Sequence, residues 1–476
     1  MSHTQQVPAP HVIVLFGATG DLAARKLLPG LFHLQVSGLM PIDYRIVGAS
    51  RRASSDESFR AHATEVVTDF GRTPARGPEW EQFAARTSLV PFSTSDMTEL
   101  GQAVSRARDE LGPDVRTLVY LSIPAQGMPD VIAALPAAGL DDPATRVILE
   151  KPFGTDLDSA RHLDALLHTI LTEDQIFRID HFLGKEDVQN ILALRFGNRF
   201  FEPLWNAEHV ARVEIDAPET LGVENRAAFY EETGAFRDMV VTHLLQALGF
   251  VAMEPPAAFS ADALAAGRRA VFDALAPVDP SRVVRGQYAG YREHAQVADD
   301  SDTETFVALE VRIDNPRWAG VPILLRTGKH LSQSRNVITL TLRPPDYGIF
   351  SAQASLPPNQ LSFEVGRRGG LRVRFRAKRP GPTMELASAE FDLPYVQQYN
   401  ATAGLEAYER LLHDAMLGDH TLFNTSGGIE RLWEVGAPLL ADPPPVVPYE
   451  SGSWGPAEAD ALAAPDGWAL PDGHDD

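Results

Sequence analysis

Hydrophobic positions in the first 150 residues form short continuous runs, separated by stretches with helical spacing. Continuous apolar runs of this length are typical of strands buried on both faces. The runs lie at 11–17, 44–50, 117–124 and 146–154. Residues 21–36 have the spacing of a helix, which Pro29 is expected to bend or split. Repeated strand–helix units predict a doubly wound parallel sheet in this part of the chain.

The pattern changes after about residue 177. Helical spacing covers 184–196 and 235–253, and alternating apolar and polar positions elsewhere predict strands. These strands are expected at 210–216, 305–313, 321–326, 336–343, 361–365 and 371–377. Many strands of this kind predict an α+β domain with a large, mainly antiparallel sheet that helices cover on one face.

The expected domain boundaries follow from these changes in pattern. Residues 1–177 form the α/β domain, and residues 178–442 form the α+β domain. Residues 443–476 are rich in proline, glycine and acidic side chains, and the end of this tail is expected to be disordered.

Composition narrows the possible functions. The 476 residues carry 42 basic and 64 acidic side chains, a net charge of −22, which argues against a nucleic-acid binder. Cysteine is absent, so disulfides and Cys-ligated zinc are excluded, and no other metal-ligand spacing is evident. No apolar run is long enough for a membrane span, and the N-terminus lacks the basic region of a secretory signal. A cytoplasmic protein is expected.

A turn of small residues follows the first expected strand. Gly17-Ala18-Thr19-Gly20 stands between that strand and a helix, where the backbone can approach a pyrophosphate and the helix N-terminus offers free N–H groups. The turn lacks the full G-x-G-x-x-G fingerprint, so an ordinary tight turn is the alternative. Its place at the head of a strand–helix pattern favours a Rossmann-like dinucleotide site.

The end of the second expected strand indicates which dinucleotide binds. An NAD site usually has an acidic residue there, which binds the ribose 2′-hydroxyl. This chain has Arg51 and Arg52 instead. Because the planar donors of arginine match phosphate oxygens, NADP is favoured over NAD. The alternative is a pair of solvated surface arginines.

Three further stretches place charged side chains where a ligand could bind. Lys151 follows a strand and either faces the ligand crevice or is a charged loop residue. In "RIDHFLGKE", His181 and Lys185 share one face if a helix begins near 181, and such a pair fits a phosphomonoester. His243 in "GAFRDMVVTH" is either a structural core histidine or a general base that Asp180 orients.

Six stretches of the chain resemble the glucose-6-phosphate dehydrogenase family in order and spacing. They are "FGATGDLAARKLLP", "EKPFG", "RIDHFLGKEDVQN", "GAFRDMVVTHLLQ", "VAMEPP" and "VPILLRTGKHL". The resemblance implies an NADP-dependent enzyme that oxidises D-glucose 6-phosphate to 6-phospho-D-glucono-1,5-lactone, the first step of the oxidative pentose phosphate pathway. It also implies a homodimer or homotetramer, with NADP bound by residues 1–177 and substrate binding and dimerisation in 178–442.

The resemblance further implies roles for single residues. His243 would be the base, Asp180 would hold its imidazole, and His181 and Lys185 would bind the substrate phosphate. Other substrate contacts would come from Lys151, Glu219, Asp238, Lys329, Lys26 and Arg335. Coenzyme contacts would come from Gly17, Thr19, Gly20, Asp21, Leu22, Arg51, Asp96, Met97 and Lys151.

The chain departs from the family pattern in three places. Phe182 stands where tyrosine is usual, so a phosphate hydrogen bond worth about 1.5–3 kcal/mol is absent and a higher KM is expected. Val241-Thr242 stand where Gln-Asn is usual, and Ser334 stands where a basic residue is usual. Arg335, one position further, is the candidate substitute.

Two alternative functions fit part of the pattern. One is a dehydrogenase of another sugar or sugar phosphate, against which the pair His181 and Lys185 argues. The other is a low-activity regulatory paralogue that binds NADP and sugar phosphate. The pair Asp180 and His243 argues against it, because a binding module needs no base.

Overall fold

The structure is a computed structural model that describes residues 7–51, 55–347, 349–350, 356–366, 369–395 and 404–470. The chain divides into two units. Unit 1 comprises Met1–Gly184, Ser260–Ala265 and Leu405–Ile429, and unit 2 comprises Lys185–Phe259, Ala266–Gly404 and Glu430–Asp476. This division differs from the expected linear boundaries, because residues 405–429 return to unit 1. In the described part of the chain, no helix has the length and apolar character needed to cross a membrane.

Unit 1 contains the predicted parallel sheet. Within the described residues this sheet has six strands, in the order β3-β2-β1-β4-β5-β6. The strands are β1 (His11–Phe16), β2 (Tyr44–Ser50), β3 (Thr87–Pro91), β4 (Arg116–Leu121), β5 (Thr145–Leu149) and β6 (Ile176–Arg178). Every residue of β1 is buried, which explains its continuous apolar run. In a Rossmann fold with this strand order, the ligand crevice lies where the order reverses, between β1 and β4.

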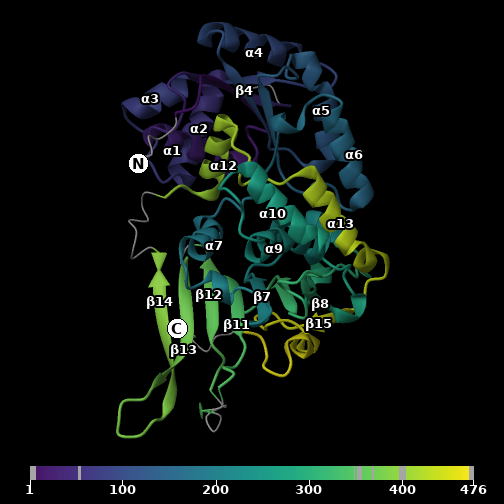
Figure 1. Cartoon of the computed structure of the whole chain (residues 1–476). Coiled ribbons are helices and arrows are strands. Elements are labelled where there is room, and N and C mark those ends of the chain that lie inside the picture. Colours follow the sequence, from purple (N-terminus) through teal and green to yellow (C-terminus); the bar gives the residue numbers. More distant parts are fainter. Residues whose placement is uncertain are drawn as a thin grey trace. The chain divides into compact units, whose positions relative to one another are not determined.

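One helix of unit 1 comes from late in the chain. The helices are α1 (Leu28–Val36), α2 (Asp56–Phe70), α3 (Pro78–Ala85), α4 (Thr98–Leu111), α5 (Met128–Ala134), α6 (Leu157–His168) and α12 (Ala407–Leu417). Figure 1 shows α12 beside α1, and the two helices are in contact. Leu411 and Leu412 of α12 belong to the same buried core as Leu31 of α1. Residues about 400 positions apart therefore complete one core.

Both helices that were expected near the glycine turn and near His243 are divided in two. A wide, π-type helical segment, η1 (Ala23–Leu27), runs directly into α1, and Pro29, which cannot donate a helix hydrogen bond, stands just after the change from wide to regular turns. The expected helix at 235–253 consists of the π-type segment η7 (Phe236–Leu244) and α9 (Leu245–Ala252).

Unit 2 contains the predicted large sheet. As far as the structure describes it, the sheet has nine strands in the order β14-β13-β12-β11-β7-β10-β9-β8-β15. They are β7 (Val210–Pro218), β8 (Val283–Tyr288), β9 (Phe306–Val311), β10 (Ile323–Gly328), β11 (Asn336–Leu342), β12 (Gln360–Val365), β13 (Gly370–Lys378), β14 (Leu386–Pro394) and β15 (Val446–Tyr449). Only the pairs β7–β10 and β8–β15 are parallel among these strands, so the prediction of a mainly antiparallel sheet is confirmed.

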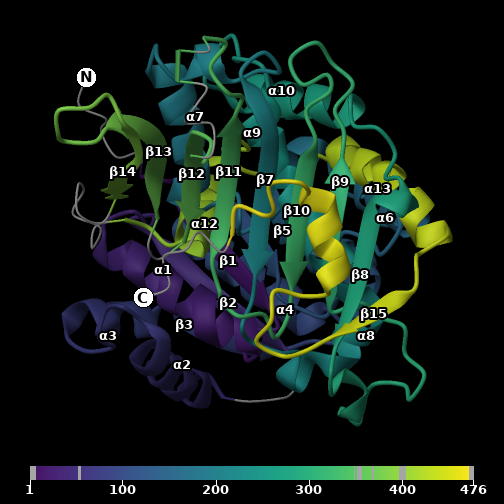
Figure 2. The same cartoon turned by 90° about the horizontal axis from the view of Figure 1, so that it is seen from below.

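Unit 2 also contains helices. They are α7 (Glu186–Gly197), α8 (Ala227–Ala235), α9, and the greater parts of α10 (Ala261–Asp273) and α13 (Ser426–Ala441). α7 contacts β12, and η7 contacts β10. Figure 2 shows the strands lying side by side, with β15 along β8.

The residues assigned to a C-terminal tail include regular structure. Residues 446–449 form β15, and a 3-10 helix, η12 (Ala457–Ala463), buries Leu462. The Trp468 indole N–H donates to the Ala459 carbonyl at 3.1 Å. The low apolar content of the segment concealed this order, although several of its apolar side chains, among them Tyr449, Leu462 and Leu470, are buried. Residues 471–476, where disorder was expected, lie outside the described residues.

Candidate active site

The glycine turn of unit 1 lies at the carboxyl end of β1, between β2 and β4. Gly17 has a φ of +73°, and its N–H donates to the Ala49 carbonyl at 3.1 Å. A Cβ at this position would lie 2.2 Å from the Ser122 carbonyl oxygen, so only glycine fits. The Gly20 N–H closes the turn by donating to the Gly17 carbonyl at 2.8 Å. The turn is thus shaped by close backbone approach, as a pyrophosphate loop requires.

The other expected coenzyme residues follow β2, β3 and the glycine turn. Arg51 directly follows β2 and is exposed, whereas Arg52 lies outside the described residues. The exposed Asp96 carboxylate accepts the Thr98 N–H at 3.0 Å, and Met97 is buried at the start of α4. The remaining side chains near the glycine turn are exposed or half-buried: Thr19, Asp21 and Leu22.

The carboxyl end of β5 carries a half-buried carboxyl group that sequence analysis did not single out. Tyr120 on β4 donates its hydroxyl to Glu150 Oε1 at 2.5 Å. Burial is the largest influence on the pKa of Glu150 and the Asp180 carboxylate adds to it, while Tyr120, Lys151 and Tyr408 oppose them; together these effects raise the pKa to about 7. An acidic residue at the end of a buried apolar strand was the available signal. Lys151, the next residue, is half-buried.

The segment that follows β6 is a turn, so the condition for a shared helical face, a helix that begins near residue 181, is not met. The Asp180 carboxylate accepts the Phe182 N–H at 2.8 Å, and this local bond competes with helix formation. Lys185 has extended backbone angles, and α7 begins one residue later. His181 and Lys185 therefore do not share one face of a helix. Gly184 lies close to α12, because a Cβ there would lie 2.8 Å from the Leu411 side chain.

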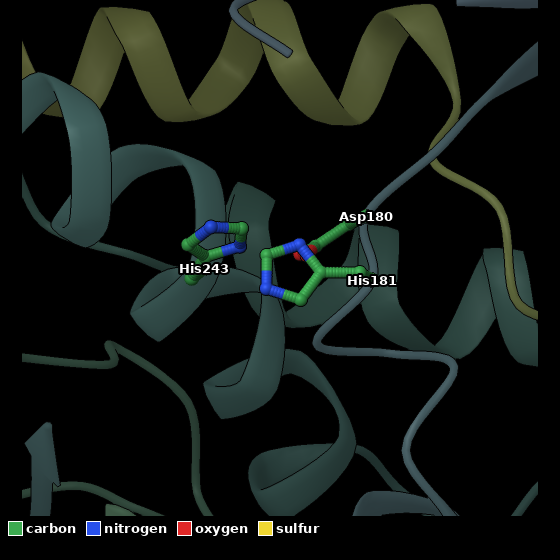
Figure 3. A group of neighbouring side chains, drawn as sticks. All are labelled: Asp180, His181 and His243. Atoms are coloured by element: carbon green, nitrogen blue, oxygen red, sulfur yellow. The ribbon is translucent and has the colours of Figure 1, made fainter. Parts of the chain in front are cut away.

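Asp180 and His181 place a carboxylate and an imidazole next to each other in unit 1. The Asp180 side chain is only 2 % exposed, and a potential ligand atom of each side chain lies within 4.8 Å of the other. The His181 ring stacks on Tyr408 with ring centroids 5.8 Å apart. Figure 3 shows Asp180 and His181 on the stretch that follows β6, and the His243 ring on η7.

Unit 2 holds His243 on η7, and a buried carboxylate fixes the start of that segment. Gly234 at the end of α8 has a φ of +64°, and a Cβ there would lie 2.5 Å from a Glu304 oxygen. Glu304 accepts the Phe236 N–H at 3.0 Å and pairs with Arg285 at 2.9 Å. Wide helical turns of this type occur often at functional sites. His243 is 1 % exposed.

The residues before His243 are buried as well. Val241 and Thr242, which replace the usual Gln-Asn, lie on η7, and the Thr242 hydroxyl donates to the Asp238 carbonyl at 2.5 Å. The Asp238 side chain is buried, and after burial itself it is the largest cause that raises the pKa of Tyr230. Asp238 and Tyr230 are therefore electrostatic neighbours.

Two of the residues expected to bind sugar hydroxyls lie together in unit 2. The Lys329 ammonium donates to the Glu219 carboxylate. It also lies 5.6 Å from the centroid of the Tyr230 ring. The Glu219 N–H donates to the Gly328 carbonyl at 2.9 Å, so the backbones that carry the pair are joined too. The pair offers an acceptor and a donor side by side.

Lys26 and Arg335 pair with acidic side chains of their own units. Lys26 Nζ lies 2.9 Å from Glu406, and both side chains are about half exposed. The Arg335 guanidinium lies 3.0 Å from Glu364. The Ser334 hydroxyl, where a basic residue is usual, accepts the Thr220 N–H at 2.8 Å.

Lysine is rare in this chain, and its positions are informative. Only five of the 42 basic residues are lysine: Lys26, Lys151, Lys185, Lys329 and Lys378. All but Lys378 are candidate site residues. A compact ammonium group on a flexible stem differs from the planar guanidinium of arginine. A scan for rare lysines would therefore have found these positions without any motif.

One group in unit 1 has the composition of a metal site, but its carboxylates already have a cationic partner. Potential ligand atoms of Asp164, His168 and Glu173 lie within 4.8 Å of one another. Arg178, which is buried, binds Asp164 at 2.6 Å and Glu173 at 2.8 Å. We therefore interpret this group as an ion-pair cluster around Arg178 and not as a metal site.

Two family models match almost the whole chain. The model described as "Glucose-6-phosphate dehydrogenase, NAD binding domain" matches residues 14–190, and the model described as "Glucose-6-phosphate dehydrogenase, C-terminal domain" matches residues 192–470.

Individual proteins show the same likeness. The chain is 37% identical over 488 residues to a glucose-6-phosphate 1-dehydrogenase of Chlamydia pneumoniae, covering 96% of this chain and 95% of the relative. A crystal structure of the Mycobacterium avium enzyme of that name is 36% identical, with a TM-score of 0.85 over 96% of this chain and 98% of that one. A glucose-6-phosphate dehydrogenase solved in complex with its substrate glucose-6-phosphate is 33% identical, with a TM-score of 0.90 over 97% of this chain and 99% of that one. Together with both family models, these matches show that the chain belongs to the glucose-6-phosphate dehydrogenase family.

Proposed function

We propose that this protein oxidises D-glucose 6-phosphate at C1 to 6-phospho-D-glucono-1,5-lactone and reduces NADP+ to NADPH, the first step of the oxidative pentose phosphate pathway. The observation that carries the proposal is the likeness, over 97% of the chain, to a dehydrogenase solved with glucose-6-phosphate bound. The glycine turn at the end of β1 and the pair Glu219 and Lys329 support it from the geometry of this chain.

His243 is the proposed base, and Asp180 is the residue proposed to orient its imidazole. Histidine is the usual base for a hydroxyl group near neutral pH, and it needs an acceptor on its second ring nitrogen. The base takes the proton of the C1 hydroxyl while the C1 hydrogen leaves with both electrons of its bond. NADP+, when bound, accepts this hydride. The alcohol loses two electrons and two hydrogens, and the proton passes from the imidazole to solvent.

The substrate is proposed to bind at both ends. His181 and Lys185 bind the phosphate, and their cationic or donor groups suit its charge. Glu219, Lys329 and Asp238 bind sugar hydroxyls, for which the Glu219–Lys329 pair already offers both an acceptor and a donor. The lysines proposed to lie near the substrate are Lys26 and Lys151, and Arg335 is a further proposed contact. Position 182 holds phenylalanine where the family usually has tyrosine, so one hydrogen-bond donor to the phosphate is absent. We therefore propose a raised KM for the substrate.

The coenzyme is proposed to bind along the carboxyl ends of β1 to β3. The turn from Gly17 to Gly20 and the start of the following helix bind the pyrophosphate. Arg51 binds the 2′-phosphate, which makes NADP the preferred coenzyme. Asp96 and Met97 lie beside the adenosine, and Lys151 contacts both coenzyme and substrate.

We also propose that the protein forms a homodimer or homotetramer and acts in the cytoplasm. A chain without cysteine suits a reducing compartment. Light scattering of the purified protein would test the assembly, and a monomer at micromolar concentration would contradict it.

Activity itself is tested by the absorbance of NADPH or NADH with glucose 6-phosphate, glucose and galactose 6-phosphate, each with NADP+ and NAD+. We expect the fastest reduction with glucose 6-phosphate and NADP+. Turnover of free glucose alone would favour the other sugar dehydrogenase. No turnover with any pair, in a protein that binds NADP+, would favour the regulatory paralogue.

Two substitutions separate the roles of the base and the phosphate site. His243→Asn should lower kcat by about 10²–10⁴-fold with little change in KM. Lys185→Ala should mainly raise KM for glucose 6-phosphate, while Lys378→Ala, which changes an exposed lysine on β13, should alter neither constant. The reverse pattern would contradict the assigned roles.

The proposed pairing of Asp180 with His243 has its own test. Residues that act as one unit give substitutions whose effects do not add. Asp180→Asn should lower kcat, and adding it to His243→Asn should lower kcat little further. Additive losses in the double variant would show that the two residues act independently.

A further inference from the structure

The last described part of unit 2 returns to the loop that carries Lys329. β15 lies along β8 (Figure 2), and Tyr449 is its final residue. The Tyr449 hydroxyl lies 2.6 Å from the Lys329 carbonyl oxygen, to which it donates, and 3.0 Å from the Thr305 hydroxyl. Its side chain is 5 % exposed, and burial raises the pKa of its hydroxyl, so the group stays a donor.

The residues after Tyr449 continue the contact. The Gly452 N–H donates to the His330 carbonyl at 2.7 Å, and the Ser332 N–H donates to the Ser453 carbonyl at 2.9 Å. Leu331 and Ser453 form an isolated parallel bridge. We call residues 446–455 the C-terminal strap. The strap bonds to three consecutive peptide units after β10.

The loop held by the strap has an uncommon backbone conformation. His330 has a φ of +51°, which residues other than glycine adopt rarely and only when surrounding contacts enforce it. Its N–H donates to the Leu221 carbonyl at 3.1 Å, and its ring packs on Tyr288 at 4.5 Å. The absent Cβ of Gly222 leaves room for that ring, because it would lie 2.4 Å from the imidazole. This conformation sets how the chain turns from Lys329 toward Leu331.

The same backbone fixes the partner of Lys329. The Leu331 N–H donates to the Glu219 carbonyl at 2.9 Å, and the Lys329 N–H donates to the Thr305 carbonyl at 2.8 Å. Each end of the Glu219–Lys329 pair is therefore anchored through the loop that the strap holds.

We propose that Tyr449 is a positioning residue for sugar binding: through the Lys329 carbonyl it holds the Glu219–Lys329 pair in the geometry that receives the sugar hydroxyls. The inference rests on the proposed function and names a residue outside its catalytic and binding groups. Tyr449 acts through Lys329, so its loss should weaken the binding of sugar phosphate and spare both the chemical step and coenzyme binding.

The test compares Tyr449→Phe with Tyr44→Phe in the full-length protein. Both substitutions remove a buried tyrosine hydroxyl, and Tyr44 lies at the start of β2 in unit 1. Loss of one neutral hydrogen bond predicts a KM for glucose 6-phosphate raised about 3–10-fold in Tyr449→Phe. Its kcat and its KM for NADP+ should stay within about twofold of the original values. Tyr44→Phe should leave all three constants unchanged.

A second measurement reports on the loop itself. Hydrogen exchange at the amides of Lys329 and Leu331 should speed up in Tyr449→Phe and not in Tyr44→Phe, because the strap protects that loop. Gly452→Ala provides a milder variant. Open space surrounds the position, but its φ of +82° disfavours alanine, so exchange and KM should change in the same direction.

The possible outcomes separate this inference from the proposed function. An unchanged KM in Tyr449→Phe, or equal losses in both tyrosine variants, would overturn the positioning role and leave the function intact. Absence of glucose 6-phosphate oxidation by the original protein would overturn the function. In that case, hydrogen exchange at Lys329 and calorimetric binding of glucose 6-phosphate would still test the role of Tyr449. Faster exchange and weaker binding in Tyr449→Phe would support the positioning role, and unchanged values would overturn it.

Discussion

Replacing Glu150 by glutamine should change how the stability of the protein depends on pH. Glutamine keeps the shape of the side chain and an oxygen that can accept the Tyr120 hydroxyl, but it cannot ionise. Burial raises the pKa of Tyr120 well above its usual value, so this donor is present at all the pH values of interest. The substitution therefore removes one titration and leaves the main hydrogen bond in place.

The magnitude follows from the raised pKa. The pKa of Glu150 is about 7 in the folded protein against 4.5 for the free side chain. The folded state thus binds this proton more tightly, so the stabilisation is fully present below pH 4.5 and is lost as pH rises through 7. At 1.36 kcal/mol for each pH unit of displacement, roughly 2–3 kcal/mol should be lost between pH 5 and pH 8. Glu150→Gln should lack this loss.

The assay is chemical denaturation of both proteins at several pH values between 5 and 8, without coenzyme or substrate. Other groups, such as Asp187 and Glu214, titrate in both proteins, so the difference between the two free energies of unfolding isolates Glu150. That difference should move by roughly 2–3 kcal/mol in favour of Glu150→Gln as pH rises. A difference that does not vary with pH would refute the reasoning, because Glu150 would then ionise as easily folded as unfolded.

Three other substitutions follow from contacts described above. Gly17→Ala should weaken NADP+ binding at least 10-fold in a fluorescence titration, because its Cβ would meet the Ser122 carbonyl at 2.2 Å; an unchanged affinity would contradict this. Arg51→Ala should weaken NADP+ binding by about 10–100-fold and NAD+ binding hardly at all, and equal losses would remove Arg51 from the 2′-phosphate site. Asp216→Ala should lower the free energy of unfolding by about 3–5 kcal/mol, since it leaves the buried Arg326 without the carboxylate 2.6 Å away. A loss under 1 kcal/mol in denaturation would show that Arg326 keeps adequate partners.

The hydrophobic pattern correctly predicted the elements in which each face has uniform surroundings, either core or solvent. The runs that became β1, β2, β4 and β5 are buried on both faces, and their apolar residues are continuous for that reason. β15 was missed because its sequence, VVPY, contains proline and lies among polar residues. A parallel edge strand tolerates proline where no ladder donor is needed, and only the neighbouring β8 makes such a segment a strand.

The candidate site was predictable at the level of residue types and less so in geometry. Lysine and histidine positions came from motifs, but the turn at Asp180 depends on one side chain accepting the Phe182 N–H. The wide turns of η7 depend on Glu304, which lies at least 60 residues further along the chain than any residue of that segment. Glu150 escaped notice because burial, which sets its pKa, has no local signature.

Both units are completed by segments near the C-terminal end of the sequence, which are synthesised last. Unit 1 needs α12 to cover α1, and the loop that carries Lys329 in unit 2 needs the strap at 446–455. A nascent chain that has passed residue 350 therefore still exposes apolar surface on its first unit and lacks a fixed Lys329 loop. Such a chain should depend on protection from aggregation until synthesis is nearly complete, and premature termination in the last tenth of the chain should cost activity.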